Sequence, residues 1–127
     1  MIDTGLDRSG EAVRLIAGAV TDASALVLEH EPVPADQVVD GSPATGYVAL
    51  DASDAGEIGV WEMTPGAMRD TEVDEVFLVI AGRATVEFVD PALPRIELRP
   101  GSIVRLDAGM RTVWTVTETL RKLFIAR

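Results

Sequence analysis

The sequence predicts a single antiparallel β-barrel domain within its 127 residues. From residue 46 onward, short apolar runs alternate with turn residues at a spacing of roughly 8 to 12 residues, which is typical of β-sandwiches and barrels. No helical pattern of convincing length lies among these runs. The hydrophobic fraction of 47% is large enough to build a buried core.

The first 45 residues predict a mostly irregular extension that packs on the barrel, and the barrel itself is expected over residues 46–127. Apolar residues between Gly10 and His30 fit a short helix, although Gly18 interrupts the pattern. Residues 26–28 are better explained as a short strand. Pro32 and Pro34 exclude a helix or a central strand, so an extended connector is expected there.

Short apolar runs predict the strands of the barrel, at residues 47–50, 58–63, 76–80, 84–89, 96–98, 103–106, 112–116 and 122–126. Between the third and fourth of these runs, Gly82 and Arg83 predict a two-residue hairpin turn. The run at 76–80 is apolar at every position, which indicates a strand covered on both faces. Because only one of its faces can look into the barrel, we expect a homodimer to cover the other.

Charge and composition exclude several classes of function. Lys and Arg number 11 against 21 Asp and Glu, and the resulting net charge of -10 would repel phosphates, so nucleic acid is not expected as a partner. The absence of cysteine and the single histidine exclude thiolate and multi-imidazole centres, so no metal and no cofactor is expected. No basic leader and no apolar run of ~20 residues occurs, so we expect a soluble, cytoplasmic protein without a membrane partner.

Two motifs carry a family resemblance. Glu75 and Gly82 are separated by six residues, and the segment from Gly101 to Thr112 keeps the spacing of a second glycine-containing motif. Together with the phrases at residues 59–66 and 114–122, this pattern resembles the cupin superfamily, in particular its small ethanolamine-utilisation-like and ureidoglycine-aminohydrolase-like branch. The resemblance implies a jelly-roll barrel.

The same resemblance locates the positions at which cupins bind a metal through histidines. In the first motif these positions hold Met68 and Asp70, or Arg69 and Thr71 with a shorter gap. In the second motif the histidine position holds Thr112. The spacing is therefore kept, whereas the metal-binding histidines are absent.

Glu75 is the most informative candidate, because the resemblance implies a carboxylate ligand at this position in metal-bearing cupins. Strand alternation places it on the inner face with Phe77 and Val79, where its charge would need a cation. Candidates for that cation are Arg69, Arg105 and Arg111. Two interpretations stay open: Glu75 is a general acid or base, or an anchor for a ligand; or it is held by an arginine and has no chemistry.

The acidic run around Glu75 has a second interpretation as a site for a hard cation such as Mg²⁺ or Ca²⁺. Alternation along a strand places Asp70, Glu72 and Asp74 on one face and Glu75 on the other. The carboxylates would then fail to converge. We therefore favour a solvated, charged approach to the buried strand.

The remaining candidates each have a functional and a structural interpretation. Trp61 and Trp114 could stack a planar ligand, but large aromatic residues in so small a barrel favour a place in the core. Thr112 could offer its hydroxyl to a ligand, and its β-propensity is the favoured explanation. His30 is expected to be an exposed histidine at the end of a strand.

These features leave three functions open. The first is a cupin that binds a small polar metabolite in the barrel without a metal, with Trp61, Arg69, Arg105, Thr112 and Trp114 as ligand-binding candidates. The second is a hydrolase, lyase or isomerase of small metabolites that uses Glu75 as its acid or base. The third is a dimerising structural module whose barrel is filled by side chains.

Overall fold

The computed structural model describes residues 15–127, and every regular element in this part of the chain is a β-strand. The strands are β1 (Glu31–Pro32), β2 (Val38–Asp40), β3 (Ala44–Ser53), β4 (Gly56–Met63), β5 (Gly66–Thr71), β6 (Glu75–Asp90), β7 (Ile96–Leu98), β8 (Ile103–Leu106) and β9 (Arg111–Ala126). All of their pairings are antiparallel. The predicted antiparallel barrel is therefore confirmed. The described residues contain no helix that could cross a membrane.

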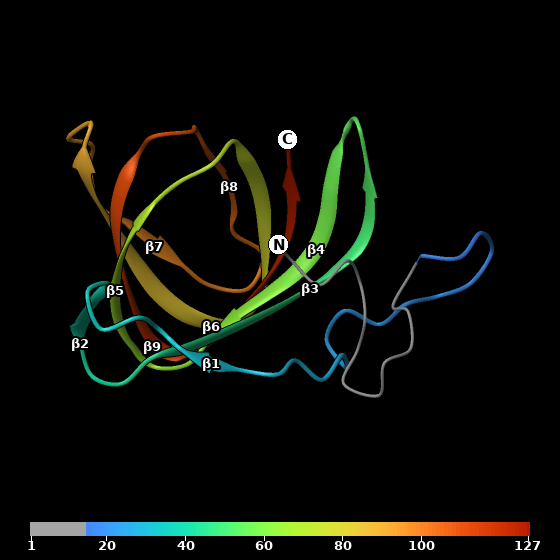
Figure 1. The fold of residues 1–127 in the computed structure, drawn as a ribbon, viewed down its shortest axis with the longest axis horizontal. Helices are drawn as coiled ribbons and strands as arrows, with labels where there is room; N and C mark the ends of the chain where they lie inside the picture. The colour runs from blue at the N-terminus through green and yellow to red at the C-terminus, as the bar shows by residue number, and fades with distance from the viewer. Residues whose placement is uncertain (1–14) are drawn as a thin grey trace.

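Two long strands, β6 and β9, run side by side and connect two layers of the barrel (Figure 1). In one layer, the order is β1, β3, β4, the second half of β9, the first half of β6, and β8. In the other layer, the order is β2, β5, the first half of β9, the second half of β6, and β7. Because both long strands cross from one layer to the other, the sheet curls around a common interior.

The hairpin predicted at Gly82 and Arg83 is wrong, because β6 continues through both residues. Gly82 has φ of +91° and lies where the register between β6 and β9 shifts. A Cβ atom at Gly82 would lie 2.1 Å from the carbonyl oxygen of Thr119, so only glycine allows this close approach. The glycine therefore bends a continuous strand between the layers. In the same way, the runs predicted at 112–116 and 122–126 are two halves of β9.

The N-terminal segment also differs from its prediction. Residues 15–30 contain turns and irregular backbone, and residues 10–14 of the predicted helix lie outside the described residues. Residues 26–28 form no strand, although Leu28 is buried in a cluster with Val48, Leu50 and Val60. These side chains pack on the outer face of β3 and β4. Apolar packing therefore holds the segment against the barrel, although residues 26–28 do not join the sheet as a strand.

The main core lies inside the barrel and follows the alternation of its strands. On β6, Phe77 and Val79 are buried in this core, whereas Val76 and Leu78 on the other face are half-buried. The inner cluster draws on both layers through Val33, Met63, Met68, Phe77, Val79, Ala84, Val86, Leu98, Leu106, Trp114, Val116, Leu120 and Phe124.

Candidate functional site

Strand register aligns a row of side chains on the inner face of one layer. Tyr47 on β3 pairs with Trp61 on β4, and Trp61 pairs with Lys122 on β9. In the next inward-facing row, Phe124 pairs with Gly59 on one side and with Phe77 on the other. A Cβ atom on Gly59 would lie 2.6 Å from the Phe124 ring, so the glycine makes room for it. Aromatic residues therefore surround the Lys122 side chain.

The Lys122 ammonium is the buried cation of the barrel interior. Its side chain belongs to a residue that is only 5% exposed, and Nζ donates a hydrogen bond of 2.5 Å to Glu75 Oε2. Nζ also lies 4.7 Å from the ring centroid of Trp61, 4.4 Å from that of Phe77 and 4.8 Å from that of Trp114. A carboxylate and three ring faces thus compensate the charge of this buried ammonium.

Glu72 is a second buried carboxylate of the interior, with an exposed fraction of 8%. It follows the end of β5, and its Oε2 accepts hydrogen bonds from the Thr112 hydroxyl at 2.6 Å and from the Trp114 indole N–H at 2.9 Å. Both donors come from the inner face of β9. The Glu72 carboxylate is therefore oriented by neutral donors.

Asp70 on β5 is the carboxyl group with the clearest electrostatic perturbation. Burial raises its pKa from 3.8 to about 6, with a further contribution from the negative charge of Glu72. The backbone N–H of Thr71 donates to Asp70 Oδ1 at 2.8 Å and, like the charge of Lys122, opposes this rise. Asp70 therefore exchanges its proton nearer to neutral pH than an ordinary aspartate does.

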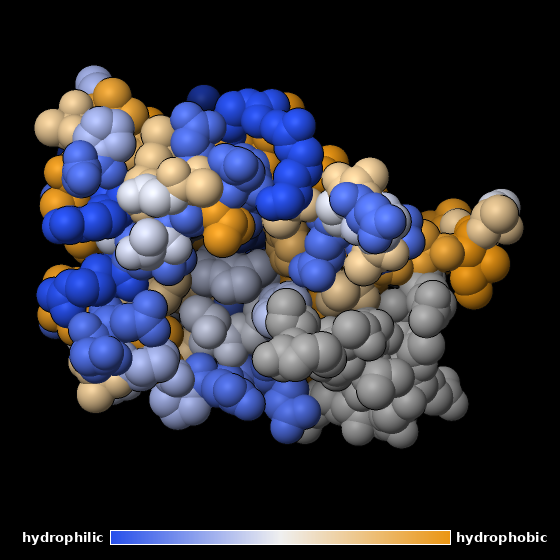
Figure 2. All heavy atoms as spheres, turned by 45° about the horizontal axis from the view of Figure 1, so that its top comes forward, coloured by the Kyte–Doolittle hydropathy of each residue, from blue (hydrophilic) through white to orange (hydrophobic). Residues whose placement is uncertain are grey.

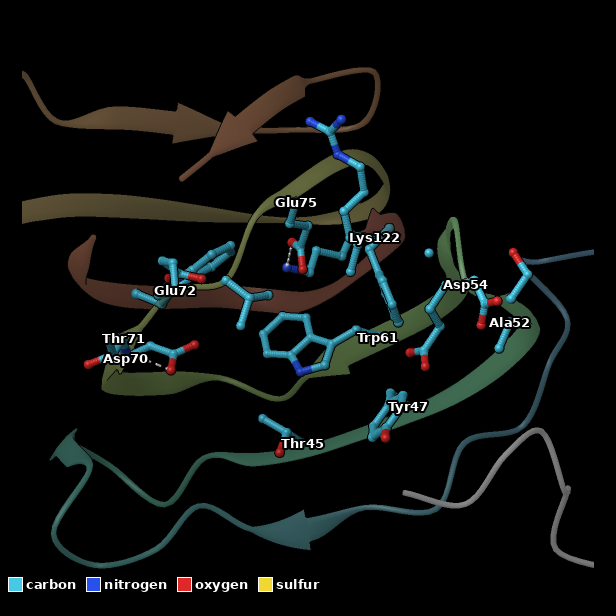
Figure 3. A pocket seen from close by; sticks show the side chains of 18 residues that line it. Thr45, Tyr47, Ala52, Asp54, Trp61, Asp70, Thr71, Glu72, Glu75 and Lys122 are labelled. Carbon is cyan, nitrogen blue, oxygen red and sulfur yellow. Dashed lines mark hydrogen bonds and ion pairs between the residues drawn. The ribbon is translucent and has the colours of Figure 1, made fainter. Parts of the chain in front are cut away.

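These groups line one cavity of about 800 Å³ at the mouth of the barrel. Figure 3 shows Trp61 in the middle of it, with Glu75 and Lys122 on one side, Asp70 and Glu72 on another, and the β3–β4 hairpin beyond. In the space-filling view the surface is hollowed near its centre, with both hydrophilic and hydrophobic side chains around the hollow (Figure 2). The cavity is large enough for a small molecule.

Three of the site residues predicted from the sequence line this cavity, and three do not. Glu75, Trp61 and Trp114 line it. Thr112 lies behind Glu72 as its hydrogen-bond donor. The other two are exposed arginines: Arg69 donates to the Asp36 carbonyl, and Arg105 pairs with Val76 on the outer face of β6.

The prediction that an arginine pairs with Glu75 is wrong, because the cation bound to this carboxylate is Lys122. The sequence contained a signal for Lys122: it is two residues from Phe124 in a predicted strand, so alternation places both side chains on one face.

The prediction of a solvated acidic run also needs correction. Asp70 and Glu72 do share a face, as alternation predicts, but this face is the inner one. After Thr71 the chain leaves the strand over residues 72–74, so alternation restarts at β6 and Glu75 faces the same cavity. Only Asp74 of the run faces away, where its Oδ1 accepts from the backbone N–H of Ala108.

The positions that the cupin resemblance marks as metal-binding hold residues that do not fit a transition metal. Met68 is buried in the core, and the Thr112 hydroxyl is engaged by Glu72. Glu75 is paired with the Lys122 ammonium, which supplies the positive charge beside this carboxylate. Among residues 15–127, no group of three or more His, Cys, Asp or Glu side chains is arranged to hold a metal ion.

Comparison with known proteins supports the resemblance seen in the sequence. The EutQ-like cupin domain family matches residues 50–124. A Salmonella typhimurium LT2 structure described as an ethanolamine utilization protein Q superposes with a TM-score of 0.64 at 16% identity, over 84% of this chain and 83% of that one. The EutQ protein of Clostridium difficile superposes with a TM-score of 0.58 at 16% identity, over 76% and 79% of the two chains.

A third similar structure is a protein of unknown function from Pseudomonas syringae pv. tomato. It superposes with a TM-score of 0.68 at 21% identity, over 81% of this chain and 45% of its own. At these identities the likeness shows the fold, which is the jelly-roll barrel of the cupins. A search of curated proteins found no match to the chain.

Proposed function

The chain belongs to the EutQ-like cupin family, and on that premise we propose that it binds a small polar molecule in the cavity at the mouth of its barrel. One observation carries this proposal. The buried pair of Glu75 and Lys122 lies in a cavity of about 800 Å³ whose lining includes four aromatic side chains. A buried ion pair is costly to maintain, and side chains that only filled a core would be apolar. The cavity argues against the alternative in which side chains fill the barrel.

The cavity combines the two elements of a small-molecule site. The rings of Trp61 and Phe124 offer apolar contact area, and the carboxyl groups of Asp70, Glu72 and Glu75 offer oriented polar atoms. In such a site the polar groups fix the orientation of a ligand, and the apolar wall supplies contact area. Lys122 supplies the positive charge beside Glu75, so a bound metal is not required for this role.

A thermal-shift screen of small metabolites tests the proposal. A compound present at 100 times its dissociation constant stabilises the protein by about 2.7 kcal/mol, which raises the melting temperature measurably. Both tryptophans of the chain line the cavity, so each binding compound should also change tryptophan fluorescence saturably. If no compound in a broad library changes either signal, the proposal is wrong.

A matched pair of variants shows whether a compound found in the screen occupies this cavity. Thr71→Tyr adds a ring at the cavity wall and should weaken binding at least tenfold. Thr117→Tyr makes the same change on an exposed residue outside the cavity and should leave the affinity unchanged. Equal affinity in both variants would place the binding site elsewhere.

Acid–base catalysis is a second candidate function, and the pKa of Asp70 favours it. A carboxyl group with a pKa of about 6 can give and take a proton near neutral pH, and Glu75 lies on the same cavity as a second carboxylate. If a compound found in the screen is converted, Glu75→Gln and Asp70→Asn should each lower the turnover by at least a hundredfold. Turnover that survives both substitutions would leave a binding role alone.

We also propose that the outer face of β6 associates with a second copy of the chain. Ile103 is 72% exposed and Ile125 is 49% exposed, and both pair with the outward-facing residues of β6. The N-terminal segment covers the neighbouring part of this face over Val48 and Val60, so the uncovered part continues a buried apolar surface. Light scattering should give twice 13.5 kDa, and Ile103→Asp should give the monomer.

A further inference from the structure

The charges around the cavity are unequal. Among residues 15–127, the cations that line it are Lys122 and Arg127, and the carboxylates are Asp54, Glu57, Asp70, Glu72 and Glu75. Lys122 is already paired with Glu75 and covered by three rings. The inner part of the cavity therefore carries negative charge that its own cation does not balance.

Glu72 and Asp70 hold this unbalanced charge. Both hydrogen bonds to the Glu72 carboxylate fall on Oε2 and come from neutral donors, so Oε1 has no donor among residues 15–127. Asp70 accepts from the backbone N–H of Thr71. Neither carboxylate is ion-paired within the described part of the chain. The raised pKa of Asp70 is the response expected of a carboxyl group with too little positive charge beside it.

The wall across from these carboxylates is aromatic. Trp61 lies between them and the β3–β4 hairpin in Figure 3. Tyr47 and Phe124 also line the cavity, with their ring centroids 6.2 Å apart. Ring faces attract organic cations, whereas an anionic ligand would meet both like charge and unfavourable ring faces. A hydrated metal ion would gain little from the rings, because hard cations require oxygen ligands.

We propose that the cavity takes a small organic cation, whose protonated amine lies between Glu72 and Asp70 and whose carbon atoms lie against Trp61. The ammonium donates hydrogen bonds to Glu72 Oε1 and to the Asp70 carboxylate, and so supplies the missing positive charge. This inference rests on the proposed function, since it names the chemical class of the ligand for the same cavity.

Three probes of similar size and different charge test the inference: propylammonium, propan-1-ol and propionate. Each is titrated at millimolar concentration, because so small a molecule makes few contacts, and tryptophan fluorescence and melting temperature are followed. Propylammonium should give a saturable change, while the alcohol and the carboxylate at the same concentrations should give at least a tenfold weaker response. Saturable binding of Mg²⁺ or Ca²⁺ without a response to propylammonium would overturn the inference.

Two variants and one control locate the amine. Glu72→Gln keeps an oxygen acceptor for Thr112 and Trp114, and Asp70→Asn keeps an acceptor for Thr71, so both should fold. Each should weaken propylammonium binding at least tenfold. Glu118→Gln removes an exposed carboxylate outside the cavity and should leave binding unchanged. Equal binding in all three variants would overturn the inference.

The outcomes also separate this inference from the proposed function. If propan-1-ol or propionate binds and propylammonium does not, the cavity is a binding site and only the choice of an organic cation is wrong. If a broad metabolite library also contains no binding compound, the proposed function is wrong as well.

Discussion

Arg121 and Lys122 are neighbours on β9, and both are buried cations paired with a glutamate, yet they face opposite sides of the sheet. Arg121 points outward: Nε donates to Glu62 Oε1 at 2.9 Å, and a second guanidinium nitrogen donates to the carbonyl of Ala23 at 2.9 Å. Glu62 Oε2 also lies 2.6 Å from His30 Nε2. The outer pair thus ties the N-terminal segment to the barrel. His30, expected to be simply exposed, belongs to this network.

Lys122 points inward, and its pair with Glu75 lines a cavity. The outer pair instead contacts the N-terminal segment. The arginine uses its planar fork to bridge two partners, and the lysine uses one hydrogen bond and three ring faces. Burial and ion pairing alone therefore do not identify a functional residue. The inner pair differs from the outer pair in lining a cavity of about 800 Å³, where a ligand can reach it.

The largest effect is expected from Arg121→Met, which removes the cation of the outer pair. Within the described part of the chain, Glu62 would then keep only His30 as an ionisable partner, and removing one partner of a buried pair costs about 3 to 5 kcal/mol. Urea denaturation monitored by circular dichroism measures this loss. The control is Arg83→Met, whose pair with Glu118 is exposed and should contribute less than about 1 kcal/mol. Equal losses in the two variants would contradict the structural role of Arg121.

A smaller loss is expected from Glu75→Gln in the inner pair. Lys122 would lose its carboxylate, but three rings would still face the ammonium and the cavity would admit water, so we expect a cost of about 1 to 3 kcal/mol. The double variant Glu75→Gln, Lys122→Met leaves no unpaired charge and should recover part of this loss. A gain in stability from Glu75→Gln alone would show that the ionised pair is strained rather than stabilising.

Asp70→Asn should stabilise the protein at neutral pH and should have no effect on its stability in acid. Because the folded-state pKa of about 6 lies above the unfolded value of 3.8, the ionised carboxyl group destabilises the folded state as pH rises through this window. Glu72, Glu75 and Lys122 are the charged groups that act on it. After solvent screening, we expect a gain on the order of 1 kcal/mol at pH 7 and none below pH 3.8.

Urea denaturation at several pH values checks this prediction. Asp54→Asn is the matched control, because Asp54 is exposed on the same cavity, and its effect should stay within about 0.5 kcal/mol at every pH. If the Asp70→Asn variant is less stable than the parent protein at pH 7, a favourable contact of the ionised carboxylate outweighs the cost of its burial.

The smallest effect is expected from removal of metal ions. With Lys122 beside Glu75, dialysis against a chelator should leave the melting temperature and the binding of cavity ligands unchanged. Elemental analysis should find no stoichiometric zinc, manganese, iron or nickel in the purified protein. Near-unit occupancy of any of these metals would contradict the prediction, because Lys122 would then not be the sole source of positive charge beside Glu75.

Local sequence patterns predicted where most strands lie along the chain but not the continuity of the strands. The runs at 96–98 and 103–106 match β7 and β8 residue for residue, because each is flanked by turn residues. At Gly82 the same rule fails. Glycine in a strand permits a turn or a bend equally, and only the pairing of both halves of β6 with β9 selects the bend.

Alternation placed Glu75 on the inner face without reference to the tertiary structure, and the same rule would have placed Lys122 there. The convergence of Asp70, Glu72 and Glu75 depended on the tertiary structure. Their relative positions follow from where β5 ends and β6 begins, and the chain between them leaves the regular geometry on which alternation relies.

The sequence by itself determined that this chain forms an antiparallel barrel with an inward-facing carboxylate at Glu75. It also determined that no histidines stand at the positions where metal-bearing cupins hold them. Both features depend on residue identity and local period. Only the tertiary structure decided that Lys122 compensates Glu75, that Arg69 and Arg105 lie outside the cavity, and that Asp70 and Glu72 face inward. Those choices depend on which strands become neighbours, and the curling of the sheet around its interior sets that arrangement.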